Sequence, residues 1–230
     1  MLRRVVCFYA DLGNHGYLPL IRRMCESAKA VMPDCETVLL TTTDDTELVG
    51  FFDRAHIMDM EITPQNLCAS RARLTTSWQL QSDAITLYAD PDIVFQKAPE
   101  IPPDADILFS WKSKRAAQPI NSGLVIAKPG CPEFWKKYAS AAINLPKPLN
   151  AWWCDQLAYN LVIGIAHKGG DYVSAFDATA KLVDARLMCA SAEEGTEESW
   201  SLHYKGSRKW NPNLFHNEKS GAGSALAVCA

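Results

Sequence analysis

Two carboxylates stand directly after an apolar stretch, in the sequence Asp90-Pro91-Asp92 that follows residues 84–89. In a parallel α/β sheet, the carboxyl end of a strand is the edge at which ligands bind. Pro91 fixes its own φ and disfavours helical backbone at Asp90, so both carboxylates can lie on one side of a stiff turn. Two hard oxygen ligands in that arrangement suit a divalent cation such as Mg²⁺ or Mn²⁺. An ordinary Asp-Pro turn has the same sequence, and Asp-x-Asp alone is weak evidence for a metal.

A second group of polar residues lies near the end of the chain, in the sequence His-Tyr-Lys-Gly-Ser-Arg-Lys-Trp at 203–210. His203 ends an expected strand, and Gly206 lets the backbone approach a ligand closely. Lys205, Arg208 and Lys209 add positive charge to the loop that follows. The segment is typical of an anion site with an imidazole beside it, and equally of a basic surface loop around a histidine whose hydrogen bonds are satisfied.

Two further segments carry polar side chains at the expected starts of elements. Asn121 and Gly123 precede an apolar run at 124–127, and Asp155 and Gln156 begin a helix directly after two tryptophans and a cysteine. A turn asparagine and a helix-capping aspartate would explain both segments without any chemistry. Our hypothesis is that Asp155 and Gln156 act in a reaction, because the tryptophans would place them beside an aromatic wall.

The elements that must position these groups alternate between strand and helix. Residues 4–10 form a near-continuous apolar run typical of a buried parallel strand, apolar residues recur at helical spacing over 18–31, and 37–43 is the next strand. This order is the unit of a parallel sheet with helices on its faces. The later patterns predict helices at 70–82, 132–143 and 155–163 and strands at 84–89, 93–95, 106–111, 122–127, 172–176 and 200–204.

The composition is that of a globular α/β protein. The 230 residues include 23 Lys and Arg against 26 Asp and Glu, a net charge of −3, and 48% are apolar. A chain of this size buries roughly 70–75% of its unfolded surface, which predicts one domain. We assign residues 1–216 to it and expect 217–230, rich in Gly, Ala and Ser, to be a mobile tail. We expect no membrane span, since no apolar run approaches about 18 residues, and no global attraction to nucleic acid.

The eight cysteines are scattered, without a Cys-x-x-Cys pair or a Cys/His cluster, so a zinc site is not expected. Several lie in apolar stretches, where cysteine behaves as a small hydrophobic residue. The first apolar run ends at Asp11 and is too short for a secretory signal. We therefore expect a reduced, cytoplasmic protein.

Taken in order, these segments resemble the metal-dependent glycosyltransferases of GT-A fold, of the glycogenin and lipopolysaccharide galactosyltransferase type. The resemblance spans about residues 4–210, and the order and spacing of the motifs carry it. It implies a single Rossmann-like α/β/α sandwich with a mainly parallel central sheet. The motifs are an acidic residue after the first strand, an arginine in the helix before the metal motif, Asp-x-Asp, Asn-x-Gly, Asp-Gln and a late His-x-x-Gly-x-x-Lys.

The resemblance also implies a role for each matching residue. Asp90, Asp92 and His203 would hold the metal, for which Mn²⁺ suits the mixed oxygen and nitrogen ligands better than Mg²⁺. Lys209 and the Gly206 backbone would contact the diphosphate. The proline usual between the last lysine and tryptophan is missing, which leaves the path of this loop open.

The remaining implied contacts concern the nucleoside and the sugar. Arg73, seventeen residues before Asp90, would reach the donor sugar, although Arg71 is close enough in sequence to be the true equivalent. The residues implied near the uridine are Tyr9, Asp11 and Asn14, and those implied around the sugar and reaction centre are Asn121, Gly123, Asp155 and Gln156.

The activity implied is transfer of a hexose from a UDP-sugar to an acceptor hydroxyl with retention of configuration. The metal and Lys209 would stabilise the charge that grows on the leaving diphosphate. Attack by Asp155 or Gln156 and attack by the acceptor from the leaving-group side both stay open. The acceptor is equally open between a glycan, a small molecule, a protein side chain and a modified nucleic-acid base.

Two other functions are compatible with the same segments. A sugar-nucleotide nucleotidyltransferase would also bind a nucleotide and a metal, but such enzymes carry a Gly-rich loop with a basic residue near the N-terminus. The segment 11–16 has two glycines and no Lys or Arg, so it fits poorly. A catalytically silent nucleotide-binding module is the other alternative, and product formation would distinguish it from an enzyme.

Overall fold

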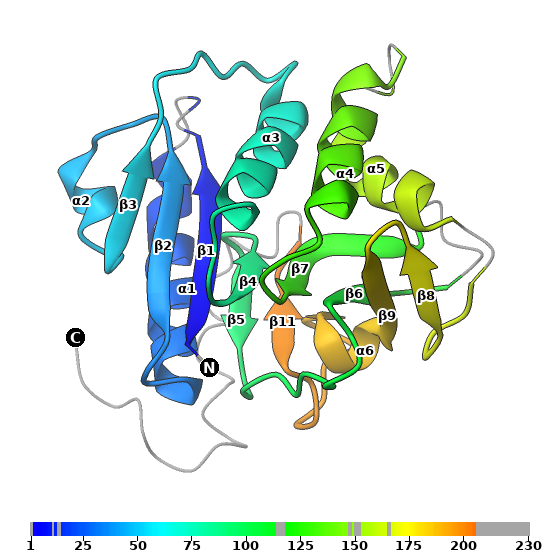
Figure 1. Ribbon diagram of the computed structural model, residues 1–230. Helices are drawn as coiled ribbons and strands as arrows, with labels where there is room; N and C mark the ends of the chain where they lie inside the picture. The colour runs from blue at the N-terminus through cyan, green and yellow to red at the C-terminus, as the bar shows by residue number, and fades with distance from the viewer. Residues whose placement is uncertain are drawn as a thin grey trace.

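The computed structural model describes residues 2–10, 12, 15–113, 118–146, 149, 153–164 and 167–205. Because apolar residues point to both faces of the central strands, the sheet is covered by helices on both sides, as predicted (Figure 1). The eight strands run in the order β3-β2-β1-β4-β7-β6-β9-β8. Strand β7 is antiparallel to β4 and β6, and β8 is antiparallel to β9, whereas the other pairs are parallel.

The first half of the fold supplies the parallel part of the sheet. Its elements are β1 (Arg3–Tyr9), a 3-10 turn (His15–Tyr17), α1 (Leu18–Val31), β2 (Glu36–Thr41), α2 (Thr46–Val49), β3 (Arg54–Ile57), α3 (Leu67–Gln79) and β4 (Ile85–Ala89). Both α2 and β3 were missed from sequence. Helix α1 covers one face through Ile21, Met24 and Ala28, all fully buried. Helix α3 lies on the opposite face.

The second half completes the sheet and adds a smaller one. Its elements are β5 (Ile93–Phe95), β6 (Ile107–Trp111), β7 (Ile120–Ala127), α4 (Pro132–Asn144), α5 (Cys154–Ile163), β8 (Tyr172–Ala175), β9 (Ala178–Asp184), α6 (Ala185–Met188), β10 (Ala190–Ser191) and β11 (Ser201–His203). The second sheet has the order β10-β11-β5. Strands β9 and β10 and helix α6 were not predicted. Strand β7 begins two residues earlier than expected, so Asn121 lies within this strand together with Gly123.

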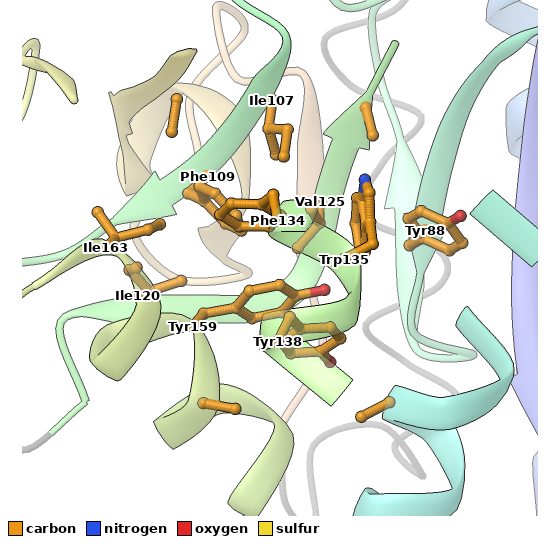
Figure 2. Close-up of a cluster of buried hydrophobic side chains, with 14 of the residues drawn as sticks. Tyr88, Ile107, Phe109, Ile120, Val125, Phe134, Trp135, Tyr138, Tyr159 and Ile163 are labelled. Atoms are coloured by element: carbon orange, nitrogen blue, oxygen red, sulfur yellow. The ribbon is translucent and has the colours of Figure 1, made fainter. Parts of the chain in front are cut away.

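Aromatic side chains fill the space between the sheet and helices α4 and α5. Figure 2 shows Phe134 of α4 and Tyr159 of α5 beside Phe109 of the sheet, with Tyr138 of α4 against Tyr159. The rings of Tyr138 and Tyr159 stack with centroids 3.9 Å apart and an interplanar angle of 6°. This packing fixes α5 against the sheet, and α5 carries Asp155 and Gln156 in its first turn.

Strand direction brings several chain segments to one edge of the main sheet. Strands β4, β6 and β9 end at this edge and β7 begins there, because β7 alone of these four runs in the opposite direction. We call it the carboxyl edge. In an α/β sheet this is the edge at which ligands bind.

Within the described residues, none of the helices is both long and apolar enough to cross a membrane. The seven cysteines in this part of the chain are free thiols. The expected tail at 217–230 lies outside the described residues.

Candidate active site

The Asp90-Pro91-Asp92 turn joins β4 of the main sheet to β5 of the small sheet. The N–H of Asp90 donates to the carbonyl of Gly123 in β7 at 2.8 Å, and the N–H of Ile93 donates to the carbonyl of Asp90 at 3.1 Å. The turn is therefore fixed to a neighbouring strand on one side and to its own backbone on the other.

Strand β11 brings the predicted histidine to this turn. It pairs antiparallel with β5, with His203 opposite Ile93, and the N–H of Tyr204 donates to the carbonyl of Asp92 at 3.0 Å. The Nε2 atom of His203 then lies 3.1 Å from Asp92 Oδ1 and 3.6 Å from Asp90 Oδ2. The three side chains each offer one ligand atom, and these atoms all lie within 4.8 Å of one another.

The chemistry of this cluster fits a divalent cation. Two carboxylate oxygens and one imidazole nitrogen are ligand types that a divalent metal ion accepts, and three ligands leave coordination positions for other oxygens. Burial lowers the pKa of His203, but its hydrogen bonds with Asp92 and Cys189 outweigh burial and raise the pKa to about 9. The surroundings of the histidine thus favour positive charge at the place where a cation would lie.

Because Gly123 has no side chain, the imidazole ring of His203 fits directly against β7 at this position. A Cβ atom at this position would lie 2.5 Å from Cε1 and 2.6 Å from Nδ1 of His203, and 3.3 Å from Oδ2 of Asp90. Contacts below 3.0 Å are not compatible with a real side chain at 123 unless the ring moves. The Asn-x-Gly motif therefore has a steric function here, because only glycine lets β7 pass so close to the histidine.

The other nitrogen of the His203 ring faces two buried side chains. Nδ1 lies 3.5 Å from Nδ2 of Asn121 and 3.8 Å from Sγ of Cys189. The amide oxygen of Asn121 accepts from the N–H of Gly123 at 3.3 Å and from Nζ of Lys205 at 3.5 Å. Asn121 is thus in contact with the metal-ligand candidate, and Cys189 is a contact that the sequence did not predict.

A partly buried arginine links the Asp90-Pro91-Asp92 turn to helix α5. Nη2 of Arg71 lies 2.7 Å from Asp90 Oδ1, and Nη1 lies 3.3 Å from Asp155 Oδ2. Burial lowers the pKa of Arg71, whereas Asp90 and Asp155 raise it, and the net direction is upward. Burial raises the pKa of Asp155 even though Arg71 opposes this. Arg71, Asp90 and Asp155 thus form one charge network that connects α3, the Asp90-Pro91-Asp92 turn and α5.

The first turn of α5 carries Asp155 and Gln156, and Gln156 contacts strand β7. Trp153, before the helix, has a left-handed backbone with φ 70°, and its side chain is 56% exposed. The amide oxygen of Gln156 lies 3.3 Å from both N and Oγ of Ser122. Asn160 Nδ2 also donates to the carbonyl of Gln156 at 2.9 Å. Gln156 is thereby fixed beside the strand that carries Asn121 and Gly123.

The structure thus brings most of the residues predicted from sequence to one place. Arg73 is a correction, because it is exposed on α3, and Arg71 is the arginine of this helix that joins the cluster. Tyr9 is buried at the end of β1, with its ring 6.2 Å from that of Tyr17. Four predicted residues lie outside the described part of the chain, and these are Asp11, Asn14, Gly206 and Lys209.

Known proteins resemble this chain in structure, whereas comparison by sequence finds no match. No family model matches the chain, and neither does any curated protein sequence. Among solved structures, a glycosyltransferase involved in the glycosylation of the major capsid of PBCV-1 is 12% identical, with a TM-score of 0.59 over 95% of this chain and 99% of that one. The galactosyltransferase LgtC, in complex with donor and acceptor sugar analogs, is 12% identical, with a TM-score of 0.53 over 92% of this chain and 91% of LgtC.

The apo form of GlyE from Streptococcus pneumoniae TIGR4, also a glycosyltransferase, is 14% identical, with a TM-score of 0.59 over 91% of this chain. The match covers 56% of the GlyE chain, so this chain corresponds to about half of that protein. At these identities the likeness establishes the fold, and the expected α/β fold is the one that these proteins share.

Proposed function

We propose that this chain is a metal-dependent glycosyltransferase that moves a hexose from a UDP-sugar to an acceptor hydroxyl with retention. The observation that carries the proposal is the convergence of Asp90, Asp92 and His203 at the carboxyl edge of the sheet. The two segments that supply them, the turn after β4 and the end of β11, are far apart in sequence. A shared fold with three glycosyltransferases supports glycosyl transfer over other reactions at such a site. The choice of uridine rests on the sequence resemblance.

Asp90, Asp92 and His203 are the residues that would hold the metal. A divalent cation held there, for which we propose Mn²⁺, would supply positive charge where negative charge develops on the leaving diphosphate. In the overall reaction, the bond between the anomeric carbon and the diphosphate oxygen breaks and its electron pair leaves with UDP. A new bond forms from the acceptor oxygen, which loses its proton.

The residues of α5 and β7 would act on the sugar side of that bond. Arg71 holds the Asp155 carboxylate in one orientation, where its negative charge would stabilise an oxocarbenium-like transition state. Because Ser122 contacts the amide oxygen of Gln156, the NH₂ end of this amide is the one that can donate to a sugar hydroxyl. Arg71 replaces Arg73 as the proposed donor-side arginine.

Release of UDP from UDP-glucose and UDP-galactose, with and without Mn²⁺, tests the proposal. We expect Asp155→Asn and Gln156→Ala to lower turnover by orders of magnitude with little change in melting temperature. Lys136→Gln, an exposed variant on α4, serves as the control and should retain full activity. A large loss of stability with nearly normal turnover would assign Asp155 and Gln156 to folding instead.

Thermal stabilisation tests the donor and the metal separately from turnover. A ligand at about 100 times its dissociation constant adds about 2.7 kcal/mol of stability. We expect UDP and Mn²⁺ together to stabilise the chain more than the sum of either alone, because their binding is linked. Stabilisation by guanosine or cytidine diphosphate sugars but not by uridine compounds would refute the donor, and full activity in excess chelator would refute the metal.

A further inference from the structure

Two buried side chains contact the ring nitrogen of His203 that points away from the carboxylates. Nε2 faces Asp92 and Asp90 and is the nitrogen that can reach a metal, whereas Nδ1 faces Cys189 and Asn121. All three of these side chains, the histidine included, are buried. Because a buried polar atom takes its hydrogen bonds from its neighbours, the partners of Nδ1 are the side chains around it.

The amide of Asn121 faces the histidine with its NH₂ end. Its oxygen accepts from the N–H of Gly123 at 3.3 Å and from Nζ of Lys205 at 3.5 Å. Nδ2 is therefore the amide atom that lies 3.5 Å from Nδ1 of His203 and 3.5 Å from Sγ of Cys189. A side-chain NH₂ group donates hydrogen bonds and does not accept them, so Asn121 is a donor toward both neighbours.

Coordination through Nε2 decides which ring nitrogen carries the proton. A neutral imidazole has one N–H, and Nε2 must give its lone pair to the metal, so the proton is on Nδ1. The Nδ1–H group then needs an acceptor, which the NH₂ end of Asn121 cannot be. Among the side chains that contact Nδ1 in the described part of the chain, Cys189 is the one that offers lone pairs, on a sulfur 3.8 Å away.

The backbone around Cys189 fixes the sulfur relative to the ring. The N–H of Cys189 donates to a carbonyl of α6 at 2.9 Å. On one side of Cys189, Oγ of Ser201 donates to the carbonyl of Met188 at 2.9 Å. On the other side, Ser191 of β10 pairs with His203 of β11. The strand that carries the histidine is thus attached on both sides of Cys189, which holds the sulfur and the ring in one arrangement.

We propose that Cys189 is a positioning residue that accepts a hydrogen bond from Nδ1–H of His203 and thereby holds the imidazole in the tautomer that binds a metal through Nε2. The inference rests on the metal of the proposed function and adds the residue on which its nitrogen ligand depends. Cys189 acts through His203 and is not itself a metal ligand. Partners of this kind change metal affinity by about 10- to 100-fold.

Titration with Mn²⁺ in the presence of UDP, followed by the electron paramagnetic resonance signal of the free ion, tests this inference in Cys189→Ala. Alanine removes the sulfur and leaves Nδ1–H of His203 facing the NH₂ group of Asn121. We expect the Mn²⁺ affinity to fall by about tenfold or more, because a buried donor loses its acceptor. Wild-type affinity in this variant would overturn the inference.

Cys35→Ala is the matched control, because it removes an equally buried sulfur from the opposite edge of the sheet. Cys35 is 3% exposed, compared with 2% for Cys189. It directly precedes β2, which runs parallel to β1 and β4 and so begins at the edge opposite to the carboxyl edge. Urea denaturation shows that both metal-free variants fold, and Cys35→Ala should keep the wild-type Mn²⁺ affinity. An equal loss of affinity in both variants would assign Cys189 to packing and overturn the inference.

A rescue variant separates the hydrogen bond from packing. Asn121→Asp places a carboxylate oxygen where the NH₂ group faces Nδ1, so it supplies the acceptor that Cys189→Ala lacks. The added negative charge favours a cation in either background, and a double-mutant cycle removes this common effect. We expect Asn121→Asp to raise the Mn²⁺ affinity by about tenfold more in Cys189→Ala than in the wild-type chain. The same increase in both backgrounds would overturn the inference.

The same variants distinguish a failure of this inference from a failure of the proposed function. If the wild-type chain binds Mn²⁺ and releases UDP from UDP-sugars, and Cys189→Ala binds Mn²⁺ equally well, the role of Cys189 alone is refuted. If Mn²⁺ binding depends on Cys189 but the wild-type chain transfers no sugar, the proposed glycosyl transfer is refuted and the role of Cys189 at a metal site stands. No Mn²⁺ binding by the wild-type chain, with or without UDP, would refute the metal and the role of Cys189 together.

Discussion

The substitution Gly123→Ala tests the geometry of the metal cluster with a single added methyl group. The new Cβ would lie 2.5 and 2.6 Å from two atoms of the His203 ring. Ordinary contacts between carbon atoms are about 3.5–4.0 Å, so one of the two partners must move by about 1 Å. The ring cannot swing away freely, because His203 is 6% exposed and its strand pairs on both sides.

The expected effects follow from this displacement. Metal–ligand distances tolerate only about 0.2 Å, so a shift of about 1 Å removes His203 from coordination. Mn²⁺ affinity should fall by about 10- to 100-fold or more. Overpacking should also lower the free energy of unfolding by about 1–3 kcal/mol.

Two measurements check this prediction, namely the electron paramagnetic resonance signal of free Mn²⁺ during titration, with UDP present, and urea denaturation. A double-mutant cycle with His203→Ala isolates the cause. In the His203→Ala background the clash is absent, so the added methyl group should cost well under about 1 kcal/mol. The same cost in both backgrounds, or wild-type Mn²⁺ affinity in Gly123→Ala, would refute the steric explanation.

Three further predictions concern the charges of the fold and the metal. Arg71→Met leaves Asp90 and Asp155 without their shared counter-charge, so it should lower the free energy of unfolding by about 3 kcal/mol. Urea denaturation measures this loss, and a value below about 1 kcal/mol would count against the network. Asp177→Ala removes a carboxylate that accepts two backbone N–H groups at the start of α4 and should cost about 1 kcal/mol. Burial raises the pKa of Asp177, but these N–H groups lower it more. Its stabilisation is therefore fully present above the ordinary carboxyl pKa and is lost as the pH falls from about 4 through the lowered pKa, so the variant and the wild type should reach equal stability in thermal unfolding only below that lowered value. Chelation with EDTA should leave the melting temperature unchanged without UDP and abolish the extra stabilisation by Mn²⁺ with UDP; a large loss of stability without UDP would indicate a structural metal instead.

The parts of the fold that were predicted correctly are those with a strong apolar pattern. Strands β1 and β4 are buried on both faces, so their sequences are continuous apolar runs. Strand β3 was missed because it is a four-residue edge strand that exposes Arg54 and His56. Strand β9 was missed because it alternates buried residues with Thr179 and Lys181, and two of the buried residues are alanines with little strand preference.

At the candidate site, too, the sequence predicted the residues that belong to a motif and missed those that depend on how the chain folds. The resemblance to GT-A glycosyltransferases, which the order of the motifs carries, implied the cluster of Asp90, Asp92 and His203. The choice between Arg71 and Arg73 depended on which face of α3 points to the site, and two residues along a helix turn the side chain by about 200°. The contact of Cys189 with His203 depends on the pairing of β10 with β11, and β10 was not predicted from the sequence.

The position of His203 also has a consequence for the newly made protein. The eight strands of the main sheet are complete at Asp184, whereas the histidine arrives with β11, a three-residue strand that belongs to the small sheet. Because a chain is synthesised from its N-terminus at about 5–20 residues per second, the core can form on the ribosome before the metal ligands are all present. A nascent or truncated chain ending near residue 199 would therefore have the main sheet but bind the cation with two carboxylates only. Binding of a divalent cation by all three side chains would thus require that β11 has docked, and it would separate finished molecules from those that have merely collapsed.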